Sequence, residues 1–310
     1  MKVSELKPAT LSRALRHGEL TLYIGSYSVR IRSALPAVAQ GVAQMYADYP
    51  SALSADFADF HISVQRPKNL RRWFRPQVNF RFDNFRPFKP LPADQAFPFL
   101  EWGLNWCVST QHHNHLVLHA AVVEKSGRAL ILPAPPGSGK STLCAALVTR
   151  GWRLLSDELT LISLKTGEIT PMCRPISLKN ASIEVIQAYA PEVIMGPPAY
   201  DTSKGTVAHM RAPADSVARS SETAQPKWIV FPKYQAEAVT QLTEHGRASA
   251  FMQLAENGFN YSMLGLHGFQ TVAQLLEQCE CYDFVYSDLD EAIALFDSMA
   301  LQLKVPPVLS

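Results

Sequence analysis

The sequence contains no long apolar run, and this absence bears first on membranes and secretion. A transmembrane helix needs roughly 18 or more consecutive apolar residues, and the 310-residue chain has no such run. The N-terminal segment likewise lacks the apolar core of a secretory signal peptide. We therefore expect a cytoplasmic protein that has no membrane partner.

Cysteine is scarce as well, and the charge is nearly balanced. The 5 cysteines are scattered, and Cys279 and Cys281 stand too close together for the CxxC pairs that bind zinc. We interpret all of them as reduced thiols, with Cys144 packed in the core of a helix. The formal net charge of +2 gives no reason to expect a nucleic-acid partner.

Residues 1–95 are expected to form a small α/β N-terminal domain. Residues 20–25 and 27–32 alternate between apolar and polar side chains around a tight turn, which predicts a hairpin. A helix is expected over 38–46 and a further strand over 60–64. No chemistry is evident in this domain, so docking of a partner or substrate is left open as its role.

The last part of this domain, residues 66–95, is both basic and aromatic. Such a stretch can bind nucleic acid or an acidic peptide. It can also be an extended arm whose rings pack on the body of the protein, and we favour this arm because the whole chain is nearly neutral. Its basic residues are Arg66, Lys68, Arg71, Arg72 and Arg75, and its aromatic residues are Trp73, Phe74, Phe80, Phe82, Phe85 and Phe88.

The most informative stretch follows the apolar run 129–132 and precedes the apolar run 143–148. A strand, a glycine-rich turn and a helix that begins with Gly-Lys-Ser form the arrangement of a phosphate-binding loop. The alternative is a Gly/Ser turn that only caps a helix. The nine residues are Ala134, Pro135, Pro136, Gly137, Ser138, Gly139, Lys140, Ser141 and Thr142.

Each part of this loop has a physical task in binding a nucleotide. Glycines allow successive N–H groups to point at phosphate oxygens, and the helix N-terminus adds partial positive charge. Lys140 can reach the β- and γ-phosphates, and the Ser141 hydroxyl can bind Mg²⁺. Ala134 stands where the motif has its first glycine, so we expect the turn to begin in ordinary backbone space, stiffened by Pro135 and Pro136. ATP and Mg²⁺ are the expected cofactors.

An acidic pair, Asp157 and Glu158, follows the next expected strand, 152–155. Ligands of α/β sheets bind at the carboxyl ends of strands, where a carboxylate can hold Mg²⁺ or accept a proton from a hydroxyl. The alternative is a strand-end turn with two solvated acids. His119 lies on the strand before the loop and is a candidate only if that strand borders the loop strand and its ring faces the phosphate edge. Otherwise it is a packed core residue.

The remaining elements of residues 96–310 can be placed only coarsely. We expect a helix over 97–108, strands over 116–124, 227–231 and 284–286, and helices near 248–257, near 272–278 and from residue 289 onward. The polar segment 216–225 is expected to be a loop.

The order of His119, the Gly-Ser-Gly-Lys-Ser loop and the stretch from Arg150 to Glu158 closely resembles the HPr kinase/phosphorylase family. Within it, the chain looks like the group called HPr-kinase-related kinase A. The resemblance implies a kinase domain of the phosphoenolpyruvate carboxykinase type over 96–310. The family's second acid is aspartate, whereas Glu158 stands here. The family's signature for dephosphorylation is not found in this sequence.

The resemblance also implies roles for single residues. Lys140 would hold phosphates, Ser141 and Asp157 would bind the metal, and one of the acids would take the hydroxyl proton. His119 would tune the pKa of the carboxylates, and Arg174 is a weaker candidate for stabilising the transferred phosphate.

We therefore expect a kinase that uses ATP and Mg²⁺ to phosphorylate a hydroxyl, a serine of a protein or peptide substrate. A small-molecule acceptor remains open within this class. The alternative from another class is a nucleotide-sensing module that binds without transferring phosphate. Whether the chain forms a homo-oligomer is left open.

Overall fold

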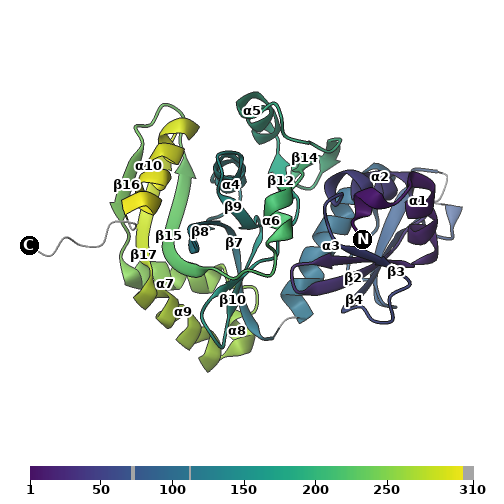
Figure 1. Ribbon diagram of the computed structural model, residues 1–310, viewed down its shortest axis with the longest axis horizontal. Coiled ribbons are helices and arrows are strands. Elements are labelled where there is room, and N and C mark those ends of the chain that lie inside the picture. Colours follow the sequence, from purple (N-terminus) through teal and green to yellow (C-terminus); the bar gives the residue numbers. More distant parts are fainter. Residues whose placement is uncertain (71–73, 112, 303–310) are drawn as a thin grey trace, which may run out of the picture. The chain divides into compact units, whose positions relative to one another are not determined.

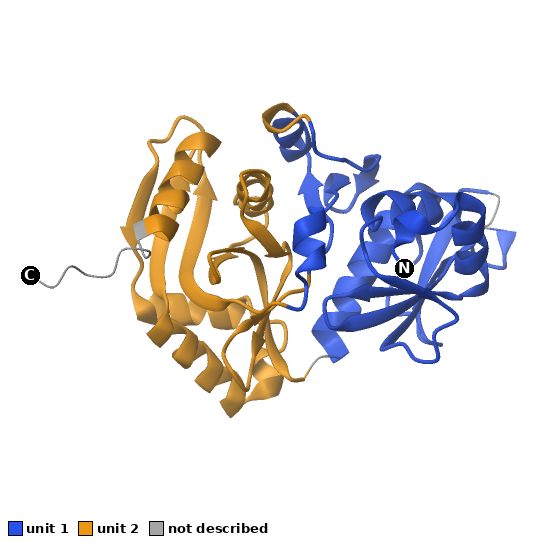
Figure 2. Ribbon diagram, in the orientation of Figure 1, with its two compact units in different colours: residues 1–111, 173–187, 192–221 blue, residues 112–172, 188–191, 222–310 orange. Residues whose placement is uncertain are grey.

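The structure is a computed structural model that describes residues 1–70, 74–111 and 113–302 (Figure 1). The chain divides into two compact units, each assembled from segments that are distant in sequence (Figure 2). Unit 1 comprises residues 1–111, 173–187 and 192–221, and unit 2 comprises 112–172, 188–191 and 222–310. This division differs from the expected boundary between residues 95 and 96. The domain boundary between residues 95 and 96 stays a prediction.

The described part of unit 1 before residue 112 contains a sheet of 6 strands and three α-helices. The elements are α1 Pro8–His17, β1 Leu20–Ile24, β2 Tyr27–Arg32, α2 Pro36–Met45, β3 Ser51–Leu53, β4 Phe60–Gln65, β5 Gln77–Phe82, β6 Leu91–Pro92 and α3 Ala96–Gln111. The strand order is β3-β1-β2-β4-β5-β6, and only β2 and β4 run parallel. Helices α1 and α3 pack on the sheet, and α2 packs on both of them.

Local sequence explains several of these elements. Helix α1 begins with Pro8, which suits the first turn of a helix, and ends at Gly18 in the left-handed conformation. The predicted hairpin is confirmed as β1 and β2, joined by a two-residue turn in which Gly25 has a φ of 60°.

The aromatic residues of the 66–95 arm pack largely on the body of unit 1. The ring centroids of Phe82, Phe85 and Phe88 lie 5.8–6.1 Å from that of Trp106 in α3. Phe74 differs, since it is 72% exposed, and Phe85 is 60% exposed in spite of its contact with Trp106. The favoured interpretation therefore holds for most of the described rings, while the exclusion of nucleic acid stays a prediction. Three residues of the arm lie outside the described part of the chain, namely Arg71, Arg72 and Trp73.

A smaller sheet of 3 strands in the order β12-β14-β13 also belongs to unit 1. Its segment contains β12 Ile176–Lys179, α5 Ala181–Tyr189, β13 Ala199–Thr202, β14 Gly205–Met210 and α6 Ala214–Ala218. The prediction of a loop over 216–225 was wrong at both of its ends. Residues 216–218 belong to α6, where Ser216 is buried, and Gln225 begins the next strand.

Unit 2 contains a mixed sheet of 8 strands. Its elements are β7 His115–Lys125, β8 Arg128–Pro133, α4 Lys140–Thr149, β9 Arg153–Ser156, β10 Leu159–Ser163, β11 Ile169–Thr170, β15 Gln225–Tyr234, β16 Gln241–Glu244, α7 Arg247–Glu256, α8 Tyr261–Leu264, α9 Leu266–Gln278, β17 Glu280–Tyr286 and α10 Leu289–Gln302. The main order is β11-β10-β7-β8-β15-β17-β16, and β9 also pairs with β7. Strands β8, β15 and β17 are parallel, and the other pairs are antiparallel. The expected α/β class is thereby confirmed in its coarse form.

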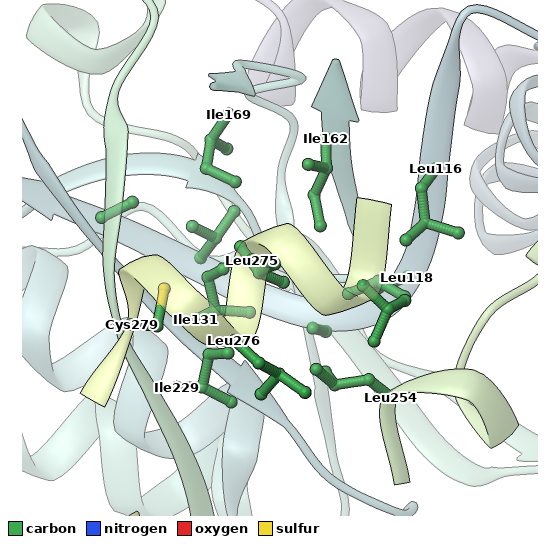
Figure 3. Close-up of a cluster of buried hydrophobic side chains, with 14 of the residues drawn as sticks. Leu116, Leu118, Ile131, Ile162, Ile169, Ile229, Leu254, Leu275, Leu276 and Cys279 are labelled. Carbon is green, nitrogen blue, oxygen red and sulfur yellow. The ribbon is translucent and has the colours of Figure 1, made fainter. Parts of the chain in front are cut away.

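Alternate side chains of β7 point into the core of unit 2. Leu116 and Leu118 join a buried cluster with Leu275 and Leu276 of α9 and Leu254 of α7 (Figure 3). Because side chains alternate between the faces of a strand, the residues between those of β7 point to the other face. Helix α4 contacts β7 as well, outside this cluster.

A helix that crosses a bilayer needs about 20 predominantly apolar residues. None of the helices among the described residues is long and apolar enough to cross a bilayer.

Candidate active site

The loop between β8 and α4 has the backbone that its glycines predict. Gly137 and Gly139 both have a φ of 88°, a left-handed conformation that glycine adopts at little cost. Ala134 is not among the residues with positive φ, and its side chain is buried. The expectation that the turn begins in ordinary backbone space is therefore confirmed. Pro135 and Pro136 are exposed and fix φ at the start of the loop.

Helix α4 begins where the loop ends. The N–H of Leu143 donates to the carbonyl oxygen of Gly139 at 2.9 Å, which is the first helical hydrogen bond. The N–H groups of the first turn of a helix have no carbonyl partner within the helix. They point out of its N-terminus, where they carry partial positive charge. The loop and the helix start together form a surface suited to an anion such as a phosphate group.

Two tyrosines at the carboxyl ends of β15 and β17 contact the loop. The N–H of Tyr234 donates to the carbonyl oxygen of Ser138 at 2.8 Å. The hydroxyl of Tyr286 donates to the carbonyl oxygen of Gly139 at 3.0 Å. A side chain at position 139 would not fit, because its Cβ would lie 2.4 Å from the Tyr286 hydroxyl oxygen. Burial raises the pKa of the Tyr286 hydroxyl, so this group keeps its proton.

His119 contacts the loop lysine. Its strand borders the loop strand, as its candidacy required, and its Nε2 lies 3.1 Å from Nζ of Lys140. Lys140 as a whole is 7% exposed, and its contact with His119 is partly buried. An ammonium group has only donors, which assigns the ring proton of His119 to Nδ1 while Lys140 is charged.

The acidic pair lies at a break between β9 and β10, and both of these strands pair with β7. Ser156 pairs with Val122 before the break, and Leu159 pairs with His119 after it. Asp157 and Glu158 therefore stand opposite residues 120–121 of β7. The end of β8 pairs with those same residues from the other side. With neighbouring strands about 4.8 Å apart, the break and the start of the loop are separated by roughly 10 Å.

The local sequence explains the break. The register shifts between β9 and β7 just before Ser156, which marks a bulge. Beyond it, the Ser156 hydroxyl accepts the N–H of Leu159 at 3.1 Å and so bridges the two acidic residues. Asp157 is 4% exposed, whereas Glu158 is partly exposed. The pair is thus one buried acid and one more accessible acid.

A segment that sequence reasoning missed lies beside His119. Where β8 leaves the sheet to form the loop, residues 257–260 bond to β7 in its place. The N–H of His119 donates to the carbonyl oxygen of Asn257, and the N–H of Phe259 donates to that of Val117. Asn260 fixes the segment, since its side chain accepts from the N–H of Val117 and donates to the carbonyl oxygen of His115, both at 2.9 Å.

This segment also contributes a side chain to the surroundings of His119. Phe259 is 51% exposed, and its ring centroid lies 5.7 Å from that of His119. Nothing in the local sequence points to this position, because the segment reaches β7 only through the fold.

The residues expected to hold Mg²⁺ suit that ion. Ser141 is a partly exposed hydroxyl in the first turn of α4, and Asp157 supplies a carboxylate. Across the described residues there is no group of three or more His, Cys, Asp or Glu side chains that could hold a metal ion. The binding of Mg²⁺ here stays a prediction.

Arg174, the weaker candidate, belongs to unit 1. Its guanidinium is buried and lies 3.5 Å from a carboxylate oxygen of Glu101, and it donates to the side chain of Asn105. Tyr46 donates to the same carboxylate at 2.6 Å. These contacts give Arg174 a structural task within unit 1, and its role towards phosphate stays a prediction.

One known family resembles the part of the chain that contains the candidate site. A family model described as SynChlorMet cassette protein ScmC matches residues 100–172. This stretch includes the candidate site from His119 to Glu158 but less than half of the chain, which is too little to assign the family. The search of curated proteins found no match.

Solved structures give a distant match. The structure of the Hpr(Ser) kinase/phosphatase from Coxiella burnetii is 9% identical in sequence, with 61% of this chain and 99% of that chain covered, at a TM-score of 0.29. A TM-score this low carries no argument about fold or function.

Proposed function

We propose that this chain is a kinase that transfers the γ-phosphoryl group of ATP to a hydroxyl group, a serine of a protein or peptide. One observation carries the proposal. The end of β8, where the loop begins, and the acids between β9 and β10 lie on opposite sides of β7. Both are level with the residues of β7 that directly follow His119. The loop proposed to bind phosphate and the pair of carboxylates therefore flank one strand, β7.

The loop is proposed to bind the phosphates of ATP. The N–H groups around Gly137 and Gly139 and the start of α4 would meet phosphate oxygens. Lys140 would add a positive charge at the β- and γ-phosphates. His119, 3.1 Å from the lysine, would hold that ammonium group in position.

Magnesium would be shared between nucleotide and protein. Ser141 and Asp157 are the proposed protein ligands, and the bound ion would neutralise charge on the β- and γ-phosphates. One of the two acids would also accept the proton of the attacking hydroxyl. The hydroxyl oxygen then bonds to the γ-phosphorus, the bond to the β–γ bridging oxygen breaks, and ADP leaves. Asp157 is proposed for the metal and Glu158, which is more accessible, for the proton.

The test is transfer of labelled phosphate from γ-labelled ATP to candidate acceptors, with products identified by mass spectrometry. Lys140→Ala should abolish turnover and weaken ATP binding, because the charge of the β- and γ-phosphates is left uncompensated. The matched control is Lys165→Ala, which removes an exposed lysine of unit 2. Near-normal turnover in Lys140→Ala would refute the site. ATP binding without transfer to any hydroxyl would favour the nucleotide-sensing module.

A further inference from the structure

The orientation of the loop's peptide groups depends on residues far from the motif. A trans peptide is planar, and its carbonyl and N–H point in opposite directions. The carbonyl of Gly139 shares its peptide group with the N–H of Lys140, and the carbonyl of Ser138 shares its own with the N–H of Gly139. Whatever holds these two carbonyls therefore also aims two successive N–H groups.

Both carbonyls are held by paired tyrosines. Tyr234 and Tyr286 are partners in register at the carboxyl ends of the parallel strands β15 and β17. The Tyr234 backbone N–H bonds to the Ser138 carbonyl at 2.8 Å, and the Tyr286 side chain bonds to the Gly139 carbonyl at 3.0 Å. Only the second bond depends on a side chain, so only Tyr286 can be tested by substitution.

Tyr286 is fixed as well as close. It is 1% exposed, its ring stacks on Phe284 with centroids 5.2 Å apart, and it meets the ring of Tyr234 at 5.7 Å. Its hydroxyl has no freedom to leave the loop without moving this aromatic group. Because burial also raises its pKa, the hydroxyl keeps its proton and remains a donor.

We propose that Tyr286 is a positioning residue for phosphate binding, acting through the Gly139 carbonyl to aim the Lys140 N–H at the bound phosphate. This rests on the proposed function of the loop. In this proposal Tyr286 acts through the loop backbone alone, so its removal should weaken binding of the phosphates of the ligand and spare binding of its base and sugar.

The test uses Tyr286→Phe, which keeps the ring and its packing and removes the hydroxyl. Affinities for ADP, ATP and adenosine are measured by calorimetry on the full chain, together with the melting temperature. Loss of one orienting hydrogen bond should weaken ADP and ATP binding roughly three- to tenfold and leave adenosine binding unchanged. The matched control is Tyr282→Phe on the same strand, whose hydroxyl bonds to Glu280 and not to the loop. It should bind all three ligands like the wild type.

The outcomes separate this inference from the proposed function. If the wild type binds no nucleotide, the proposed function fails and this inference fails with it. If the wild type binds ADP and Tyr286→Phe binds it equally well, only the inference is overturned. An equal loss of adenosine and ADP affinity, or a lower melting temperature with unchanged ADP affinity, would give Tyr286 a structural role and would also overturn it.

Discussion

Nζ of Lys140 and Nε2 of His119 are 3.1 Å apart, across the boundary between helix α4 and strand β7. Each residue comes from a different element, and neither element alone would fix the other's side chain. The contact links the residue of the loop that carries charge to the strand that also borders the acidic pair.

The first prediction concerns the energy of this contact. A hydrogen bond to a charged group typically contributes about 1.5–3 kcal/mol to the stability of a protein. His119→Ala, Lys140→Met and the double variant should therefore show a coupling of about 1–2 kcal/mol in the free energy of urea unfolding. The control pairs His119→Ala with Lys165→Met, which should be additive. Additivity in the first pair would mean that the contact contributes nothing to stability.

The second prediction separates the two acids. Asp157→Asn and Glu158→Gln keep the shape of each side chain and remove its charge and basicity. A positioned base contributes about 10²–10⁴-fold to such reactions, so at least one variant should lose phosphoryl transfer by that factor while still binding ATP. Label transfer and calorimetry measure the two quantities. Glu256→Gln, exposed on α7, serves as the control, and full activity in both acid variants would rule out their proposed roles.

The third prediction compares the two glycines of the loop. Both have a φ of 88°, so alanine at either position is strained, at a cost of about 1–2 kcal/mol. At Gly137 the added Cβ meets nothing within 4 Å, whereas at Gly139 it meets the Tyr286 hydroxyl at 2.4 Å. Gly139→Ala should therefore lower both stability and ADP affinity more than Gly137→Ala. Equal effects, measured by thermal melting and calorimetry, would contradict this geometry.

The fourth prediction concerns pH and His115. Burial lowers the pKa of this histidine below its usual value of 6.5. The unfolded chain then binds more protons than the folded chain, so stability is complete above about pH 6.5 and declines as the pH falls below it. Titration by NMR should place the His115 ring below 6.5, and His115→Gln should flatten the fall in urea midpoint towards pH 5.5. A ring that titrates above 6.5 would contradict the prediction, because His115 would then stabilise the fold at low pH.

Much of the loop's immediate frame was predictable because its signals are local. The apolar strands β7 and β8, their turn at Ser126 and Gly127, and the helix after the loop all follow from patterns within a few residues. The structure confirms a positive φ at both turn residues, as a tight hairpin needs. The local sequence was sufficient to predict these elements because the residues that contact one another are also close in sequence.

The remainder of the site depends on pairings that no local pattern encodes. Tyr286 reaches Gly139 only because β15 and β17 lie beside β8 in order, and Asn260 reaches Val117 only because a loop replaces β8 beside β7. The acidic pair was recognised by its position after a strand. Its placement across β7, opposite the end of β8, required the register of three strands.

The segments of the two units alternate along the chain, so during synthesis neither unit can complete its fold until its later segments have been made. The smaller sheet of unit 1 is built from strands within residues 176–210, and these leave the ribosome after β7, β8 and the whole glycine-rich loop. At a synthesis rate of about 5–20 residues per second, these strands are made roughly 5–20 seconds after the first 111 residues. Unit 2 is completed later still, when β17 emerges and pairs with β15. A nascent chain that ends before Tyr286 therefore carries the loop without one of the groups that hold it.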